Sequence, residues 1–305
     1  MSTQDRPLLT AIIVAYNSED AISETVQHLE EVTACLDVEI VVIDNGSSDR
    51  SAERAGQALR RGEVIRSSEN LGFGGGVNLG LRAASGTYAL IMNDDVWPQT
   101  ECIEQMLDVV SSETVGLVGP RMTNSDGQPS FAVRSHLPGM RDEIARISNF
   151  LRGLNTRTSY PSGQQPIEVE MLICACVIGR TDVLRELGGF NSSFFMYGED
   201  LDLGRRLKSA NLKLMTVPGA TAVHERGISP DRRFRGHEFS ERILNARDLY
   251  YRIWLPRHER IAVNLLRAMG LSDQPYRFKY HLSRALWDGP SLTGLRNIEP
   301  LKSQS

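Results

Sequence analysis

The first half of the sequence alternates short apolar runs, rich in β-branched residues, with segments of helical periodicity. Leu9 to Ala15 and Glu39 to Ile43 are strand-like, and residues 19–36 between them have a helical pattern. The same order then recurs over 64–66, 77–84 and 88–92. A strand-helix-strand repeat favours an α/β fold with a mostly parallel sheet flanked by helices. In such sheets, ligands bind at the carboxyl ends of the strands.

The chain is long enough for one main domain and an appendage. Its 305 residues, 41% hydrophobic and 24% charged, can bury a full core but are few for two complete domains. We place the boundary at residue 230, with a main α/β domain over 1–230 and a C-terminal helical extension over 231–305. The other expected elements are strands at 168–178, 212–217 and 221–223, helices at 181–187, 238–254 and 258–269, and an insertion at 120–168.

Charge is distributed unevenly along the chain. From Arg232 onward there are 14 Lys and Arg against 7 Asp and Glu, whereas residues 1–231 carry 20 against 31. A basic, aromatic-rich extension suits peripheral contact with an anionic membrane, and an ordinary helical cap with solvated arginines fits equally well. The extension has no nucleic-acid-binding motif, so we expect no nucleic-acid partner. The sequence is also compatible with a homodimer.

Neither the apolar runs nor the cysteines indicate a membrane span or a zinc site. The longest clear apolar run, Met171 to Ile178, is far too short to cross a bilayer, and the first residues lack an apolar signal segment. We therefore expect a cytosolic protein, peripheral at most on the inner face of the plasma membrane. The four cysteines lack zinc-ligand spacing, which predicts reduced and mostly buried thiols.

Polar residues follow the first two expected strands. The first strand runs into Tyr16 and Asn17, and the second ends at Asp44, Asn45 and Gly46. A carboxylate can accept the imide N–H of uracil or thymine, and a tyrosine can stack on a base. Taken singly, Asp44 ahead of a glycine is also good turn chemistry.

A glycine-rich loop follows the third expected strand. Residues 70–78 read Asn-Leu-Gly-Phe-Gly-Gly-Gly-Val-Asn and open a helix, so their backbone could approach a ligand and their amides could face a phosphate. The segment fails the dinucleotide-binding fingerprint, because Val77 or Leu79 stands where the third glycine is required. That fingerprint also normally follows the first strand of its sheet.

Two acidic sites complete the set of candidate functional residues. Asn93, Asp94 and Asp95 end the fourth strand, where paired acids are poor strand residues unless they hold a divalent cation, and a solvated turn before Pro98 is the alternative. A neutral histidine such as His224 would be a sensible further ligand. Glu199 and Asp200 open a helix after an aromatic run, which suits a general base, although the helix dipole alone also favours acids there.

The ordered motifs carry a family resemblance. The chain contains Ala-Tyr-Asn (15–17), Asp-Asn-Gly-Ser (44–47), the glycine-rich loop, Asn-Asp-Asp (93–95), Gly-Gly-Phe (188–190) with Tyr-Gly-Glu-Asp (197–200), and His-x-x-Gly-x-Ser (224–229). This series closely resembles the family 2 glycosyltransferases, inverting enzymes of the Rossmann-like GT-A fold, and within them the rhamnosyltransferase-like branch. The resemblance covers residues 8–230.

The resemblance implies a role for each matching residue. Asp200 would be the catalytic base, with Glu199 positioning the acceptor, and Asp95 and His224 would bind Mg2+ or Mn2+. Asp44 would read the base, and Asn93 would face the ribose. The residues expected to line the nucleotide-sugar are Ala15, Tyr16, Asn17, Asp44, Asn45, Asn70, Gly72, Phe73, Gly74, Asn78, Asn93 and Asp94.

The resemblance also sets the expected reaction. It implies transfer of L-rhamnose from dTDP-L-rhamnose to a cell-surface glycan or lipid-linked glycan, with a UDP-sugar donor as the first alternative. A non-catalytic nucleotide-sugar-binding protein is the rival. The chain departs from the usual family pattern at Cys174-Ala175-Cys176 and at Asn191-Ser192-Ser193. The resemblance therefore predicts the class of reaction more firmly than the identity of the donor sugar.

Overall fold

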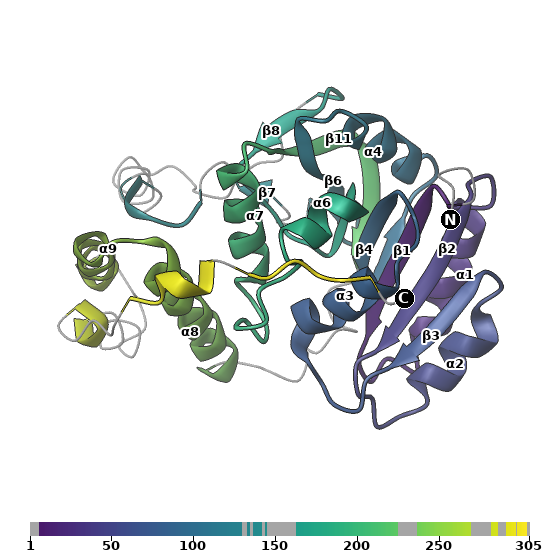
Figure 1. Cartoon of the computed structure of the whole chain (residues 1–305), viewed down its shortest axis with the longest axis horizontal. Helices are drawn as coiled ribbons and strands as arrows, with labels where there is room; N and C mark the ends of the chain where they lie inside the picture. Colours follow the sequence, from purple (N-terminus) through teal and green to yellow (C-terminus); the bar gives the residue numbers. More distant parts are fainter. Residues whose placement is uncertain are drawn as a thin grey trace.

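We describe a computed structural model of the chain over residues 6–129, 133–134, 137–141, 144, 163–224, 237–269, 282–285, 291–296 and 298–303. Its centre is a nine-stranded, mostly parallel sheet (Figure 1). The strands of this sheet are β1 Leu9–Ala15, β2 Val38–Asp44, β3 Gly62–Arg66, β4 Tyr88–Asn93, β5 Val96–Pro98, β6 Val115–Thr123, β8 Ile167–Val169, β10 Cys176–Arg180 and β11 Lys213–His224. Their order is β3-β2-β1-β4-β10-β6-β11-β5, with β8 paired to β11.

The expected mostly parallel sheet flanked by helices is confirmed. Strands β1 to β4 run parallel, as do β6 and β11, whereas β10 lies antiparallel between β4 and β6. Strands β5 and β8 pair antiparallel with β11. A further pair, β7 Val133–Arg134 and β9 Met171–Leu172, forms a second small sheet.

Helices cover both faces of the sheet. They are α1 Ile22–Val32, α2 Ser51–Ala58, α3 Gly72–Ala83, α4 Cys102–Val110, α6 Thr181–Glu186, α7 Glu199–Ser209, α8 His237–Trp254, α9 Arg257–Met269 and the 3-10 turn η2 Thr293–Arg296. Side chains of β1 alternate between the two faces: Leu9, Ile13 and their neighbours pack with α1, α2 and α4, whereas Ile12 and Val14 pack with α3, α6 and α7. Burial on both faces explains the continuous apolar character of the strand.

Two strand predictions were wrong. The run 168–178 is not one strand, because its parts pair with three different partners: β8 with β11, β9 with β7, and β10 with β4. Conversely, 212–217 and 221–223 belong to the single strand β11, which keeps its pairing with β6 across a register shift between Val217 and Thr221. Pro218 and Gly219, which suggested a break, lie at that irregularity.

The region 120–168 also differs from the expected insertion. Strand β6 occupies its first residues, and β8 its last. Most of the stretch between them, including Tyr160, lies outside the described residues, as does the basic loop at 232–235. Helices α2 and α4 were not anticipated, although each has a face of small or apolar residues packed on the sheet.

The C-terminal extension packs on the main domain at two places. Tyr250 and Tyr251 of α8 share a buried cluster with Phe194 and with Leu201 of α7. The last described segment, in yellow, runs back from η2 toward α3 and β1 (Figure 1), and the Leu301 amide donates to Arg185 O at 2.9 Å. The boundary at residue 230 stays a prediction. Within the described residues, no helix has the length and apolar character needed to cross a membrane.

The packing of α3 on β1 generates a stability prediction. A Cβ on Gly80 would lie 2.3 Å from Ile12 Cγ2, whereas a Cβ on Gly56 of α2 would meet only Val64 Cγ2 at 3.8 Å. We expect Gly80→Ala to lower the free energy of unfolding by about 1–3 kcal/mol through overpacking, despite the better helix propensity of alanine. Gly56→Ala is the matched control and should stabilise the protein by about 0.4–1 kcal/mol. Urea denaturation of both variants measures the difference, and equal effects would contradict it.

Candidate active site

The carboxyl ends of β1, β2 and β4 bring the first predicted site residues together. Ala15 lies opposite Asp44, and Val14 lies opposite Asn93. The Asn45 amide donates to Ala15 O at 2.8 Å. The polar residues that follow these strands therefore share one edge of the sheet, as the sequence predicted.

Asp44 and Asn17 organise the two loops at this edge. Asp44 is 6% exposed, and one of its carboxylate oxygens accepts the Ser47 amide at 3.2 Å. Asn17 has a φ of +49°, and its side-chain oxygen accepts the Ser48 amide at 2.8 Å. Thus Asp44 makes the turn contact that its sequence context also suggested.

The amide side chain of Asn45 holds the glycine-rich loop. It is 2% exposed, donates to Gly72 O at 3.0 Å and accepts the Leu71 amide at 3.0 Å. A third contact joins it to the Asn70 side-chain oxygen at 3.2 Å. In this structure Asn45 therefore fixes the start of α3 against β2.

Three amides at the start of the glycine-rich loop have acceptors within the protein, and the contact of this loop with a phosphate stays a prediction. The Gly72 amide donates to the Asn70 side chain at 2.9 Å, and the Phe73 amide donates to Phe195 O at 3.3 Å. With Leu71 bound to Asn45, protein oxygens already accept these three amides at the start of α3. The helix terminus is capped by the chain itself.

The glycines of the loop instead allow close packing. Gly72 has a φ of +74°, and a Cβ there would lie 2.0 Å from Phe195 O. A Cβ on Gly74 would lie 2.8 Å from Phe190 Cβ. Phe73 makes an edge-to-face contact with Phe190, with ring centroids 5.9 Å apart. At Gly72 and Gly74, the close approach that glycine allows is made by atoms of the protein itself.

Asn78 also has a protein partner rather than an open position. Its side chain is 6% exposed, accepts the Phe190 amide at 2.8 Å and donates to Phe190 O at 2.8 Å. This two-bond pairing ties α3 to the turn that precedes α7. Asn78 thus supports the site by holding α3 against this turn, with both ends of its amide hydrogen-bonded to the protein.

The Asp94-Asp95 pair is deeply buried. Asp94 is 7% exposed and accepts the hydroxyl of Ser18, while its backbone oxygen accepts Thr25 Oγ1 at 2.6 Å. Burial and the neighbouring charge of Asp95 raise the pKa of Asp94 to about 7, although the Ser18 bond acts in the opposite direction. Ser18 and Thr25 were missed by the sequence reasoning, because neither belongs to a local motif.

Asp95 is the strongest candidate for a cation ligand. Its side chain is fully buried, and among the described residues neither carboxylate oxygen has a hydrogen-bond partner. His224 Nε2, at the end of β11, lies 3.2 Å from Asp95 Oδ1. Strand pairing creates this contact, because His224 lies opposite Val96. A buried carboxylate without donors is costly unless a cation or proton compensates it.

The side chains of Asp95 and His224 are of types that bind divalent ions, but they make up only part of a coordination shell. Carboxylate oxygen suits Mg2+ and Mn2+, and an imidazole nitrogen favours Mn2+. No group of three His, Cys, Asp or Glu side chains placed to hold a metal occurs in the described part of the chain. The pair could therefore supply two protein ligands and leave the remaining positions to water or ligand oxygens.

The second acidic pair opens α7. Glu199 is 8% exposed, its Oε2 has no hydrogen-bond partner among the described residues, and Asp200 is half-buried. Burial and the charge of Asp200 raise the pKa of Glu199 to about 8. Burial and the charges of both carboxylates also raise the pKa of the Cys174 thiol, which indicates that Cys174 lies close to the pair.

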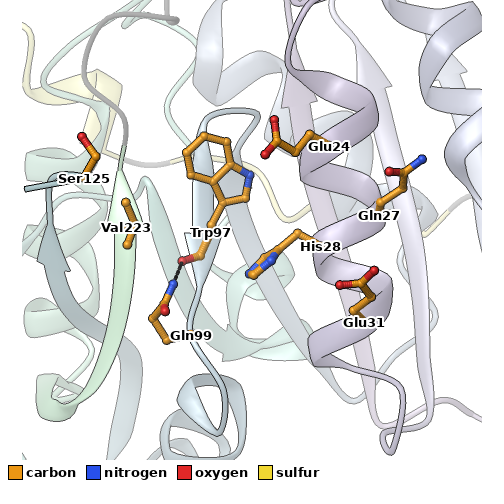
Figure 2. A pocket seen from close by; sticks show the side chains of 8 residues that line it. All are labelled: Glu24, Gln27, His28, Glu31, Trp97, Gln99, Ser125 and Val223. Carbon is orange, nitrogen blue, oxygen red and sulfur yellow. Dashed lines mark hydrogen bonds between the residues drawn. The ribbon is translucent and has the colours of Figure 1, made fainter.

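A groove on the surface has a lining separate from these residues. Figure 2 shows its lining, which comes from α1, β5, the 125 turn and β11, and its volume is about 500 Å³. The Trp97 indole and the Glu24 and Glu31 carboxylates contribute to it, and His28 Nε2 lies 2.7 Å from Pro98 O. None of the predicted site residues lines this groove, although Val223 adjoins His224.

Known proteins similar to this chain share its fold. The chain resembles the structure of GalNAc-T7 with UDP, GalNAc and Mn2+, with a TM-score of 0.61 and 13% identity over 96% of this chain and 56% of that one. It therefore spans little more than half of that structure. The mannosyltransferase PcManGT from Pyrobaculum calidifontis, in complex with GDP-Man and Mn2+, gives a TM-score of 0.54 with 17% identity, over 95% and 73%. Both are glycosyltransferases of the GT-A fold.

Sequence comparison identifies the family. The N-acetylglucosaminyl-diphospho-decaprenol L-rhamnosyltransferase of Mycobacterium tuberculosis is 29% identical over 227 residues, covering 67% of this chain and 74% of the relative. The low-salt glycan biosynthesis hexosyltransferase Agl10 of Haloferax volcanii is 24% identical over 229 residues, covering 73% and 69%. The model of glycosyl transferase family 2 matches residues 10–188, more than half of the chain. This chain therefore belongs to glycosyl transferase family 2 and is a glycosyltransferase.

Proposed function

We propose that the protein is a metal-dependent, inverting glycosyltransferase that transfers L-rhamnose from dTDP-L-rhamnose to a hydroxyl of a cell-surface glycan or lipid-linked glycan. The observation that carries the proposal is the fully buried Asp95 carboxylate, which has no donor among the described residues apart from the approach of His224 Nε2 at 3.2 Å. Such a group has a physical reason to bind a cation.

Similarity supports the donor and the acceptor class. The Mycobacterium tuberculosis relative, at 29% identity, is an L-rhamnosyltransferase whose acceptor is N-acetylglucosaminyl-diphospho-decaprenol. A UDP-sugar is the alternative donor, favoured by the UDP in the GalNAc-T7 structure. The basic C-terminal extension would suit a lipid-linked acceptor at an anionic membrane surface.

Asp95 and His224 would hold the Mg2+ or Mn2+ ion. When bound, the ion supplies positive charge that stabilises the departing nucleoside diphosphate without a proton donor. Asp44 and Tyr16 would recognise the base, and Asn93 would face the ribose. We assign Asn45, Gly72, Gly74 and Asn78 to shaping this pocket, because their contacts are with the protein itself.

Asp200 would act as the general base. A sugar hydroxyl is a weak nucleophile, so a carboxylate must accept its proton as the new bond to the anomeric carbon forms. The bond from that carbon to the diphosphate oxygen breaks on the opposite side, which inverts the configuration. Burial and the neighbouring charge of Asp200 raise the pKa of Glu199 to about 8, which favours its protonated form, so we assign the base to Asp200. Glu199 can then donate a hydrogen bond to the acceptor.

Two substitutions test the assignment of the base and the metal ligand. We expect Asp200→Asn to lower transfer by about 10²–10⁴-fold, because proton removal is lost, while donor binding persists. Asp95→Ala should abolish the metal dependence of donor binding. The measurements are nucleotide release across UDP- and dTDP-sugars with Mn2+ or Mg2+, using an N-acetylglucosaminyl-diphospho-prenol acceptor, and donor calorimetry.

The exposed Asp182 in the first turn of α6 supplies the matched control for this experiment. Asp182→Asn changes the same functional group far from the acidic pairs in sequence and should leave transfer unchanged. Full transfer by Asp200→Asn would exclude Asp200 as the base. Donor binding without transfer in the wild-type protein, across the whole panel, would favour the non-catalytic binding protein.

The protonation of Glu199 generates a pH prediction. Its pKa of about 8 in the folded protein lies above the usual glutamate value of about 4.3, so the folded state binds more protons between these values. The free energy of unfolding should therefore fall as pH rises through this window, by at most about 1.4 kcal/mol per pH unit from this group. Glu199→Gln should remove that part of the slope. Denaturant titrations at pH 5, 6.5 and 8 measure it, and parallel curves for the two proteins would refute it.

A further inference from the structure

The first turn of α7 is held in place from two directions by one buried carboxylate. Asp202 is fully buried, and its Oδ2 accepts Arg206 Nε at 2.8 Å within the same helix. Its Oδ1 accepts the indole Nε1–H of Trp254, the last residue of α8, at 2.8 Å. The Asp202–Arg206 ion pair is therefore buried.

Arg206 extends the contact to the turn that precedes α7. It is 6% exposed, and its two terminal nitrogens donate to Leu187 O at 2.8 Å and to Gly189 O at 2.7 Å. The next residue of that turn, Phe190, is the one paired with the Asn78 side chain. Arg206 and Asn78 therefore both hold the chain at 187–190, where the segment that leads into α7 begins.

Arginines from α7 and from the C-terminal extension contact the Trp254 ring. The guanidinium groups of Arg205 and Arg296 lie over its ring, 5.8 Å and 5.2 Å from the centroid. Arg296 Nε also donates to Ile253 O at 2.6 Å. The orientation of the indole N–H is thus set by residues on both sides of the expected domain boundary.

Asp202 and its partners contact the helical turn that carries Glu199 and Asp200. Asp202 follows Glu199 by three residues, one turn of helix, and its amide donates to Gly198 O at 3.0 Å. Gly198 has a φ of +88° and Tyr197 a φ of +68°, so the chain enters α7 through a left-handed bend. A displacement of Asp202 would therefore carry Glu199 and Asp200 with it.

A buried ion pair is a poor device for stability alone. Replacing such a pair with apolar residues of similar volume is often neutral or stabilising, whereas the pair fixes one geometry. One donor, Trp254, comes from α8, whereas the other, Arg206, lies on α7 with the acceptor and the acidic pair. We infer that Trp254 and Arg206, acting through Asp202, are positioning residues that orient the Glu199–Asp200 pair toward the acceptor. This inference rests on the proposed function.

Trp254→Phe tests the inference, because it removes the N–H donor and keeps an aromatic ring. We expect kcat for sugar transfer to fall about 10- to 100-fold, since small misplacements of catalytic groups have effects of that size. The donor Kd and the donor KM should change less than about twofold, because the residues assigned to the donor lie on other elements. The ratio of donor hydrolysis to transfer should rise, because Asp200 would no longer meet the acceptor hydroxyl correctly.

Tyr250→Phe is the matched control on the same helix. Tyr250 is fully buried, and its hydroxyl has no hydrogen-bond partner in the described part of the chain, so this variant loses a polar hydrogen without losing a bond. Its kcat should stay at the wild-type value. Arg206→Lys provides a second test if Trp254→Phe does not fold, since lysine keeps the charge but loses the forked contacts to Leu187 O and Gly189 O.

The outcomes separate the two proposals. A fall in kcat with unchanged donor binding, in Trp254→Phe or Arg206→Lys but not in Tyr250→Phe, supports positioning. Full kcat in the folded variants overturns this inference alone, while an active wild type keeps the proposed function. Another outcome is that the variants lose kcat and donor-binding capacity equally, in proportion to the fraction of protein that is no longer folded. That result would show a purely structural role and would also overturn the inference. A wild-type protein that transfers no sugar overturns both.

Discussion

The close contact between α3 and the turn before α7 is the constraint on which the rest of the site depends. Glycines at 72 and 74 let Phe195 O and the Phe190 side chain approach the helix more closely than any Cβ would allow. The Asn78 side chain then locks the two segments together through both of its polar ends. Because the turn leads directly into Glu199, the depth of this contact sets how near the second acidic pair comes to the sheet edge.

The fold places acidic groups where water cannot solvate them. Asp94, Asp95 and Glu199 are each less than 9% exposed, and the oxygens of Asp95 and the Oε2 of Glu199 lack partners among the described residues. Burying such groups is unfavourable, so each must find a proton, a hydrogen bond or a cation. The three acids differ in their surroundings: Ser18 bonds Asp94, His224 approaches Asp95, and burial with the charge of Asp200 raises the pKa of Glu199 to about 8. Under the proposed function, these differences would suit chemically distinct roles for residues of the same type.

Sequence patterns identified much of the fold and only part of the site. Alternation of strands and helices was enough for the parallel sheet, because strands buried on both faces need apolar residues throughout, as in β1. The pattern could not divide 168–178 among three pairing partners, since pairing is non-local. It placed Asp44, Asp95, Glu199 and Asp200 correctly at the ends and starts of elements. It could not distinguish them from Asn45 and Asn78, which lie in the same motifs and bond to the protein itself.

The sequence by itself determined the strand-helix alternation of the first half, the polar ends of the strands and the family to which the chain belongs. All three depend on residue type and spacing, which are local properties of the chain. The tertiary structure decided which polar atoms are satisfied and which are left open. Asp202, for example, looks like an exposed helix acid until Trp254, 52 positions later, donates to it in a buried contact. Hydrogen bonding and burial depend on contacts between residues far apart in the sequence, so only the folded chain could separate the supporting residues from the reactive ones.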